Sequence, residues 1–202
     1  EAEEIGIRHA LELVIDPLHS TGEILFFSIG SKEIQRIVKR LNESMPPGVI
    51  ALPFLRDIDE TYKEPLGGNV QELLKHWTCE RSQVFDMLVY RKVPTKYVKP
   101  GTYHRAVIVA TNIAEASITI NSLKYVVETG YSIVSSYDYL TNQTTYLPEP
   151  ISESSRLQRR GRVGRVSSGY VHYCYRQNSR VNNVTQKTIA NIDLSQSFID
   201  LI

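Results

Sequence analysis

Eight residues near the end of the chain, 158–165, combine four arginines with two glycines. A guanidinium group is always charged and carries its donors in a rigid fork, which suits phosphate oxygens. If the stretch is helical, the spacing puts Gln158, Arg162 and Arg165 on one side of the helix. Gly161 has no side chain, so another surface can approach there closely. The stretch therefore predicts a site for a polyphosphate or for a nucleic-acid backbone.

Charge is distributed unevenly around this stretch. No acidic residue occurs from 154 to 192, although the whole chain has a net charge of only +1. Basic runs are most often solvated surface patches. A patch that contacts nucleic-acid phosphates without any catalytic role is therefore a competing interpretation.

The rest of the composition is that of an ordinary globular protein. The chain has 202 residues, of which 42% are hydrophobic, and its two cysteines are too few for a disulfide framework. No apolar run is long enough to span a membrane, and no signal peptide is visible. We expect a cytoplasmic protein with no membrane partner, and leave nuclear or virion locations open.

The elements that must position the arginines read as a parallel α/β sheet. Continuous apolar runs at 24–29 and 49–54 are typical of strands buried on both faces. Apolar residues recur at helical spacing before and between them, over about 7–18 and 34–41. Ser31 is placed to cap the second of these helices. Strand, tight turn, helix and strand together form the unit of a parallel sheet.

A second polar segment follows a later strand. The run 106–110 predicts that strand, and Thr111, Asn112 and Glu115 come directly after it. Open parallel sheets bind ligands beyond the carboxyl ends of their strands, so a hydroxyl and the backbone N–H groups of this segment are candidate phosphate contacts. Further strands are predicted at 124–128 and 170–175. Between them, residues 131–138 and 144–147 predict a β-hairpin.

Three of these segments resemble a known family. The residues Gln158-Arg159-Arg160-Gly161-Arg162-Val163-Gly164-Arg165 resemble motif VI of superfamily 2 helicases, in the spelling of the DEAH/DExH branch. The segment 111–120 closely resembles motif V of that branch, and residues 22–34 resemble its motif IV. The chain departs from the family at Ala116, where Thr or Ser is usual, and at Glu128, which replaces an Asp. The motif VI spelling leans toward viral enzymes of the nucleoside-triphosphate phosphohydrolase type.

The resemblance implies a fold, a domain division and an activity. The fold is an α/β, RecA-like three-layer sandwich with a mostly parallel central sheet and a β-hairpin between motifs V and VI. Residues 1–176 are the second RecA-like domain, and 177–202 are a linker and the start of a following domain that resembles a winged helix. The chain has no phosphate loop and no Asp-Glu-x-His sequence. Both lie on the first domain in this family, so this piece alone is expected to be inactive.

The family's site residues carry over to matching positions. Arg162 and Arg165 are implied as arginine fingers for ATP hydrolysis, with Gln158 orienting the attacking water and Gly161 beside the nucleotide. The implied contacts to the RNA backbone are Thr111, Asn112, Ser117, Thr119 and Ser31. The cofactor is ATP with Mg²⁺, bound mainly by the first RecA-like domain. The partners are that domain and RNA, as a single strand or as a duplex with an overhang. A DNA translocase of the same superfamily remains an alternative.

Residues 56–103 carry no clear assignment. His76 and Cys79 lack the two further ligands that structural zinc needs, and no metal site is predicted. The aromatic residue that stacks on adenine in this family could be Phe85, Tyr90, Tyr97 or Tyr103.

Overall fold

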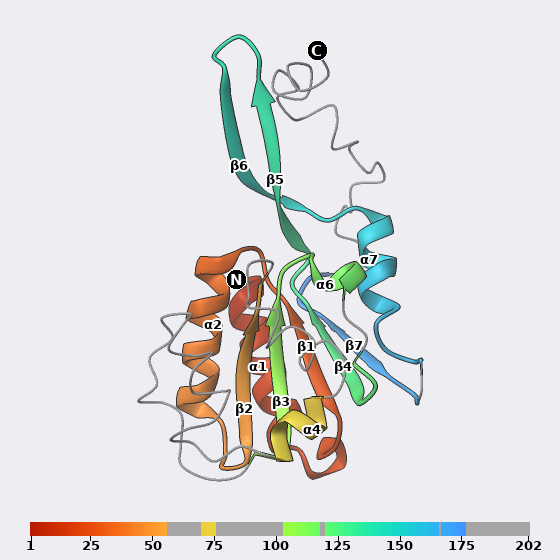
Figure 1. Cartoon of the computed structure of the whole chain (residues 1–202). Helices are drawn as coiled ribbons and strands as arrows, with labels where there is room; N and C mark the ends of the chain where they lie inside the picture. The colour runs from red at the N-terminus through yellow and green to blue at the C-terminus, as the bar shows by residue number, and fades with distance from the viewer. Residues whose placement is uncertain (56–69, 76–102, 118–119, 166, 177–202) are drawn as a thin grey trace.

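The computed structural model describes residues 1–55, 70–75, 103–117, 120–165 and 167–176. Its centre is a five-stranded sheet in which every neighbouring pair of strands is parallel, in the order β2-β3-β1-β4-β7 (Figure 1). The strands are β1 (Glu23–Phe27), β2 (Val49–Phe54), β3 (Arg105–Ala110), β4 (Leu123–Glu128) and β7 (Tyr170–Tyr173). The parallel sheet predicted from the apolar runs is confirmed.

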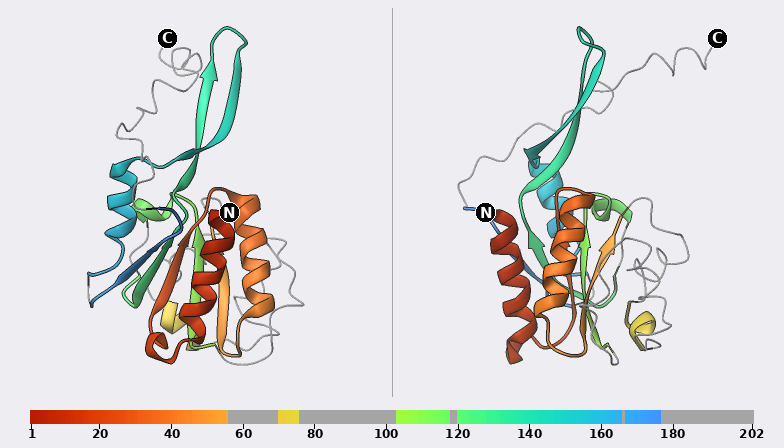
Figure 2. Two further views of the ribbon diagram at one scale, coloured as in Figure 1. Left: turned by 180° about the vertical axis from the view of Figure 1, so that it is seen from behind. Right: turned by 90° about the vertical axis from the view of Figure 1, so that its left-hand side faces the viewer.

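Helices cover the sheet, mainly on one side among the parts of the chain that are described. Helices α1 (Ala2–Ile15) and α2 (Ser31–Ser44) lie against one face, and the short α4 (Val70–Lys75) lies on the other (Figure 2). The strands β1, β2 and β3 are buried along their whole length. This agrees with their unbroken apolar sequence, because a strand covered on both faces has no polar side to present.

The edge strand β2 is protected by a side chain of helix α2. Asn42 is buried, and its amide reproduces a strand neighbour's hydrogen bonds with Ala51. The Ala51 N–H donates to Asn42 Oδ1 at 2.8 Å, and Asn42 Nδ2 donates to the Ala51 carbonyl at 3.1 Å. The outer backbone groups at this position are therefore satisfied without a further strand.

A buried arginine fastens the amino ends of the strands. Arg105 opens β3 and is 2% exposed. Its Nε donates to the Gly22 carbonyl at 2.7 Å and its Nη1 to the Leu13 carbonyl at 3.0 Å. Burial lowers the pKa of Arg105, and the charges of Tyr125 and Glu23 oppose that shift. One side chain thus joins the end of α1, the start of β1 and the start of β3.

The predicted hairpin is confirmed and projects away from the sheet. Strands β5 (Tyr131–Asp138) and β6 (Gln143–Pro150) pair antiparallel, from Tyr131 opposite Pro150 to Asp138 opposite Gln143. Figure 1 shows it rising from the carboxyl end of β4 and returning to α7 (Glu153–Arg160). Large apolar side chains at its tip are open to solvent, with Tyr139 81% and Leu140 88% exposed.

Within the described ranges, no helix combines the length and the apolar character needed to cross a membrane. The segment 177–202, predicted as a linker and the start of another domain, lies outside the described residues.

Candidate functional site at the carboxyl edge of the sheet

Three strands end together at one edge of the sheet, and the polar segments predicted as functional follow them. Phe27 at the end of β1 is in register with Ala110 at the end of β3 and with Glu128 at the end of β4. The Ser28 N–H donates to the Ala110 carbonyl at 2.7 Å, so the loops after β1 and β3 begin side by side. Parallel sheets place their ligands at this edge.

The loop after β3 is a compact turn that leads into the short helix α6 (Ala114–Ser117). The Thr111 hydroxyl accepts a hydrogen bond from the Ile113 N–H at 3.4 Å, and the Thr111 carbonyl accepts from Ala114 at 3.1 Å. Asn112 is exposed and Thr111 is half-buried. The predicted backbone contacts Thr111 and Asn112 therefore lie at the carboxyl edge. Ser117 closes α6, and Thr119 lies outside the described residues.

The loop after β1 brings Ser31 to the same edge, but Ser31 is not the cap of the helix that follows. Ser31 is the first residue of α2 and is exposed, while Gly30 is the N-cap in an extended conformation. The prediction that Ser31 caps the helix is wrong by one position. A glycine cap has no side-chain oxygen, so the first-turn N–H groups of α2 receive no side-chain cap.

Helix α7 begins at Glu153 and ends earlier than predicted. Ser152 is its N-cap, with its hydroxyl accepting from the Ser155 N–H at 3.1 Å. The helix ends at Arg160, with Gly161 as C-cap, and Gly164 has φ +80°. The prediction that one helix carries Gln158, Arg162 and Arg165 is therefore wrong. A glycine at the cap and another in the left-handed region end the helix within the motif.

Arg162 and Arg165 nevertheless return to the helix end. Arg162 Nε donates to the Gln158 carbonyl at 3.4 Å, and Arg165 Nε donates to the Gly161 carbonyl at 3.1 Å. Both guanidiniums thus lie beside carbonyls at the negative end of α7. Burial and the charge of Arg165 lower the pKa of Arg162, while Glu115 opposes the shift. Gln158, Gly161 and Arg165 are exposed, and Arg162 is half-buried.

The sequence did not reveal that another arginine of this run is buried and paired. Arg159 is 0% exposed. Its Nε donates to Glu115 Oε1 at 2.7 Å and its Nη1 to Glu128 Oε1 at 2.8 Å. Its guanidinium carbon also lies 4.7 Å from the centre of the Phe27 ring. We call Arg159, Glu115 and Glu128 the Arg159 cluster. The one available signal was the isolated acid at the end of β4, where a buried strand should carry an apolar residue.

Glu128 is fixed from several directions. It is 0% exposed, and its Oε1 also accepts from the Gly130 N–H at 2.7 Å. Burial raises the pKa of this carboxyl, and the charge of Arg159 together with the Gly130 hydrogen bond opposes the rise. The family's Asp at this position is one methylene shorter, so Glu128 extends further toward Arg159.

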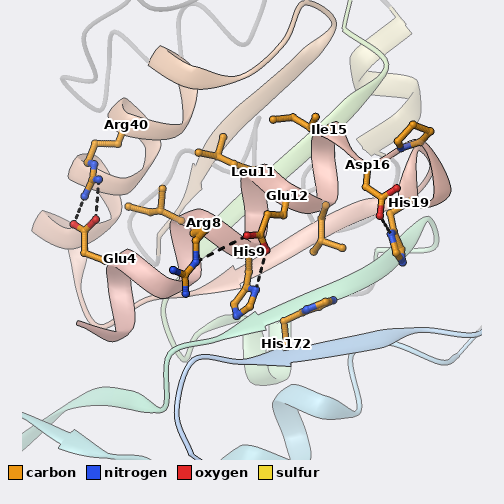
Figure 3. Close-up of a pocket in the computed structure, with 13 residues that line it drawn as sticks. Glu4, Arg8, His9, Leu11, Glu12, Ile15, Asp16, His19, Arg40 and His172 are labelled. Atoms are coloured by element: carbon orange, nitrogen blue, oxygen red, sulfur yellow. Dashed lines mark hydrogen bonds and ion pairs between the residues drawn. The ribbon is translucent and has the colours of Figure 1, made fainter.

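A hollow lies away from this edge, along the outer side of α1. Its volume is about 730 Å³, and Figure 3 shows His9 and His172 facing one another within it. Their ring centres are 5.5 Å apart, and His19 pairs with Asp16 at 2.8 Å. No predicted site residue lines this hollow. In the described part of the chain, no group of three or more His, Cys, Asp or Glu side chains could hold a metal ion.

Of the predicted adenine-stacking candidates, only Tyr103 is described, and it is 6% exposed, so its ring is not open to a ligand. Phe85, Tyr90 and Tyr97 lie outside the described residues, as do His76 and Cys79.

Comparison with known proteins shows the family to which the chain belongs. The family model for the helicase conserved C-terminal domain matches residues 92–167, a span that holds the loop after β3, the hairpin and the arginine run. The chain is 39% identical over 199 residues to a protein of Acanthamoeba polyphaga mimivirus that is named as an ATP-dependent RNA helicase. The chain is a helicase C-terminal domain of the DExH/DEAH type.

Cellular relatives and solved structures agree. The DExH-box ATP-dependent RNA helicase DExH1 of Arabidopsis thaliana is 35% identical over 159 residues, which are 79% of this chain. The crystal structure of the Escherichia coli DExH-box NTPase HrpB matches with a TM-score of 0.70 at 23% identity, over 99% of this chain and 21% of that one. The predicted RecA-like fold is therefore confirmed. The chain spans 11% of the mimivirus protein and 13% of the Arabidopsis protein.

Proposed function

We propose that this chain is the C-terminal motor domain of an ATP-dependent RNA helicase, with residues 1–176 as the second RecA-like domain. ATP and Mg²⁺ would be held mainly by the first RecA-like domain, where carboxylates would bind the metal and the metal would neutralise charge on the phosphates. The observation that carries the proposal is the exposed end of α7. It presents Gln158 and Arg165, with Arg162 beside them, at the end of a helix that contacts α6, the helix that follows Thr111.

Two functions share this edge in the proposal. Closure of the two domains would bring Arg162 and Arg165 against the γ-phosphate, where their donors stabilise the charge that spreads over the phosphoryl oxygens in the transition state. Gln158 would orient the attacking water. Thr111, Asn112, Ser117, Thr119 and Ser31 would hold the sugar-phosphate backbone of the RNA without reading its sequence.

The test is Arg165→Lys in the full-length protein, with Arg160→Lys as the control. Both arginines are exposed and lie in the same run, but Arg160 is outside the Gln158, Arg162 and Arg165 set. Lysine keeps the charge and loses the planar fork. We expect Arg165→Lys to lower kcat for ATP hydrolysis at least about a hundredfold, or about 3 kcal/mol, with little change in ATP or RNA affinity. Arg160→Lys should remain close to wild type.

The opposite pattern would support a different function. If Arg165→Lys hydrolysed ATP at the wild-type rate but bound RNA more weakly, the arginine run would be a patch for nucleic-acid phosphates, and a non-catalytic binding module would be the better reading. Parallel assays with single-stranded DNA and RNA distinguish an RNA helicase from a DNA translocase.

A further inference from the structure

The Arg159 cluster joins three parts of the chain that are far apart in the sequence. Arg159 lies on α7, Glu115 on α6 and Glu128 at the end of β4, with the acids 44 and 31 residues away from the arginine. Arg159 Nη1 also donates to the Tyr131 carbonyl at 3.4 Å, at the start of the hairpin. Arg159, itself part of the arginine run, therefore forms hydrogen bonds with α6, with the end of β4 and with the base of the hairpin.

Helix α7 is attached to α6 through one acid. Glu115 Oε1 accepts from Arg159, and Glu115 Oε2 accepts from the Ser155 hydroxyl at 3.1 Å. Ser155 and Arg159 are four residues apart, so they lie on the same face of α7. Figure 1 shows the two helices side by side at the top of the sheet. Any shift of α6 must therefore move α7 or break both bonds.

The cluster has hydrogen-bonding capacity that it does not use. Glu128 Oε2, Arg159 Nη2 and Tyr175 Oη are buried and make no hydrogen bond within the described part of the chain. Burial raises the pKa of Tyr175, and the charge of Glu128 raises it further, so these groups act on one another. A purely structural network gains by satisfying every buried group. A network that has unpaired buried donors and acceptors can instead exchange hydrogen-bond partners, and each charged group keeps an opposite charge beside it.

The Arg159 cluster connects two segments, 111–117 and 158–165, for which we propose different ligands. Glu115 lies four residues after Thr111, on the RNA side of the edge. Arg159 lies next to Gln158 and three residues before Arg162, on the nucleotide side. Local contacts hold each segment, and the Arg159 cluster connects them.

We propose that Arg159 is a positioning residue, which through Glu115 and Glu128 transmits movement of the RNA-contacting segment 111–117 to Arg162 and Arg165. This inference rests on the proposed function of both segments. When an RNA strand moves Thr111, the displacement of Glu115 would reorient α7 and bring the guanidiniums of Arg162 and Arg165, which follow the end of α7, into line with the γ-phosphate. Arg159 itself touches neither ligand.

The experiment compares Glu115→Gln with Glu153→Gln in the full-length protein. Both changes neutralise an acid that pairs with an arginine of α7. Glu153, however, pairs with Arg156 on its own helix, through Oε2 at 2.7 Å, and among the described residues it bonds no other element. Glutamine has nearly the same shape as glutamate, so Glu115→Gln removes the charge while retaining an oxygen for Arg159. ATP hydrolysis is measured with and without saturating poly(U), along with the KM for ATP and the Kd for poly(U).

We expect Glu115→Gln to reduce the ratio of the rates with and without poly(U) at least about tenfold, with KM and Kd within about threefold of wild type. Glu153→Gln should retain the wild-type ratio. Ser155→Ala frees Glu115 Oε2 without altering any charge, and should reduce the ratio about threefold. It provides the same test if Glu115→Gln unfolds.

Two results would overturn the inference. If Glu115→Gln, or Ser155→Ala in its place, lowered both rates by the same factor, the Arg159 cluster would only hold the fold. If both rates stayed at their wild-type values, no coupling would pass through the cluster. In both cases the proposed function would stand, because wild type would still be stimulated by poly(U). A wild-type protein that hydrolyses no ATP would overturn the proposed function instead, and this inference with it.

Discussion

Removing the guanidinium of Arg159 should destabilise the domain severely. In Arg159→Met the new side chain still packs on Phe27, but Glu128 keeps its charge at 0% exposure without its counter-ion. Breaking a buried ion pair from one side costs about 3–5 kcal/mol. The whole free energy of unfolding of such a domain is about 5–15 kcal/mol. We therefore expect a marginally folded variant at pH 8.

The loss should depend on pH in a known direction. Burial already raises the pKa of Glu128 above its ordinary 4.5, and loss of the opposing guanidinium raises it further. A carboxyl whose pKa is higher in the folded state than in the unfolded state lowers stability as the pH rises through the folded-state pKa. The deficit of Arg159→Met relative to wild type should therefore shrink from pH 8 to pH 5. Urea unfolding followed by circular dichroism at both pH values measures this.

A double-mutant cycle with Glu128→Gln separates the ion pair from packing. Because Glu128→Gln removes the stranded charge, Arg159→Met/Glu128→Gln should be more stable than Arg159→Met alone at pH 8, with a coupling energy of about 2 kcal/mol or more. Additive losses, or a loss below about 1 kcal/mol for Arg159→Met, would refute the reasoning.

Two further predictions concern the backbone at the hairpin base and the hollow beside α1. Gly130 has φ +84°, and an added Cβ would lie 2.6 Å from the Tyr175 ring, so Gly130→Ala should cost about 2–4 kcal/mol in urea unfolding. Gly164 has φ +80°, but a Cβ added there would have no atom within 4 Å, so Gly164→Ala should cost only about 1–2 kcal/mol. Equal losses of stability for the two variants would contradict the steric argument. Burial, with the charges of His9 and His19, lowers the pKa of His172 below 6.5, so stability is lost as the pH falls below 6.5. The Tm of wild type should therefore fall more steeply than that of His172→Gln between pH 7.5 and 5.5, and parallel curves would contradict this.

The sheet was predictable because its signal is local. Each of β1, β2 and β3 is a continuous apolar run, and burial on both faces demands such a run. The hairpin was predictable for a similar reason, since two runs rich in Tyr, Val, Ile and Thr flank a short turn.

The candidate site was predictable only where its residues follow a strand or spell a motif. Thr111 comes directly after β3, so its place at the carboxyl edge follows from the parallel order of the strands. The end of α7 was not predicted, because helical spacing says nothing of where Gly161 will end the helix. The pairing of Arg159 was not predicted either, because its partners come from α6 and β4 and are set by the tertiary fold.

The buried Arg105 has a consequence for the order in which the chain can fold. Helix α1 has no basic residue in its last turn, yet the partial negative charge of its carbonyls needs a cation there. Arg105 supplies it through the Leu13 carbonyl from 92 residues further along the chain. We therefore expect the final turn of α1 to become fully ordered only when β3 enters the sheet, although α1 is synthesised first. Closure of so long a loop is slow, so we expect pairing of β3 to limit completion of this helix.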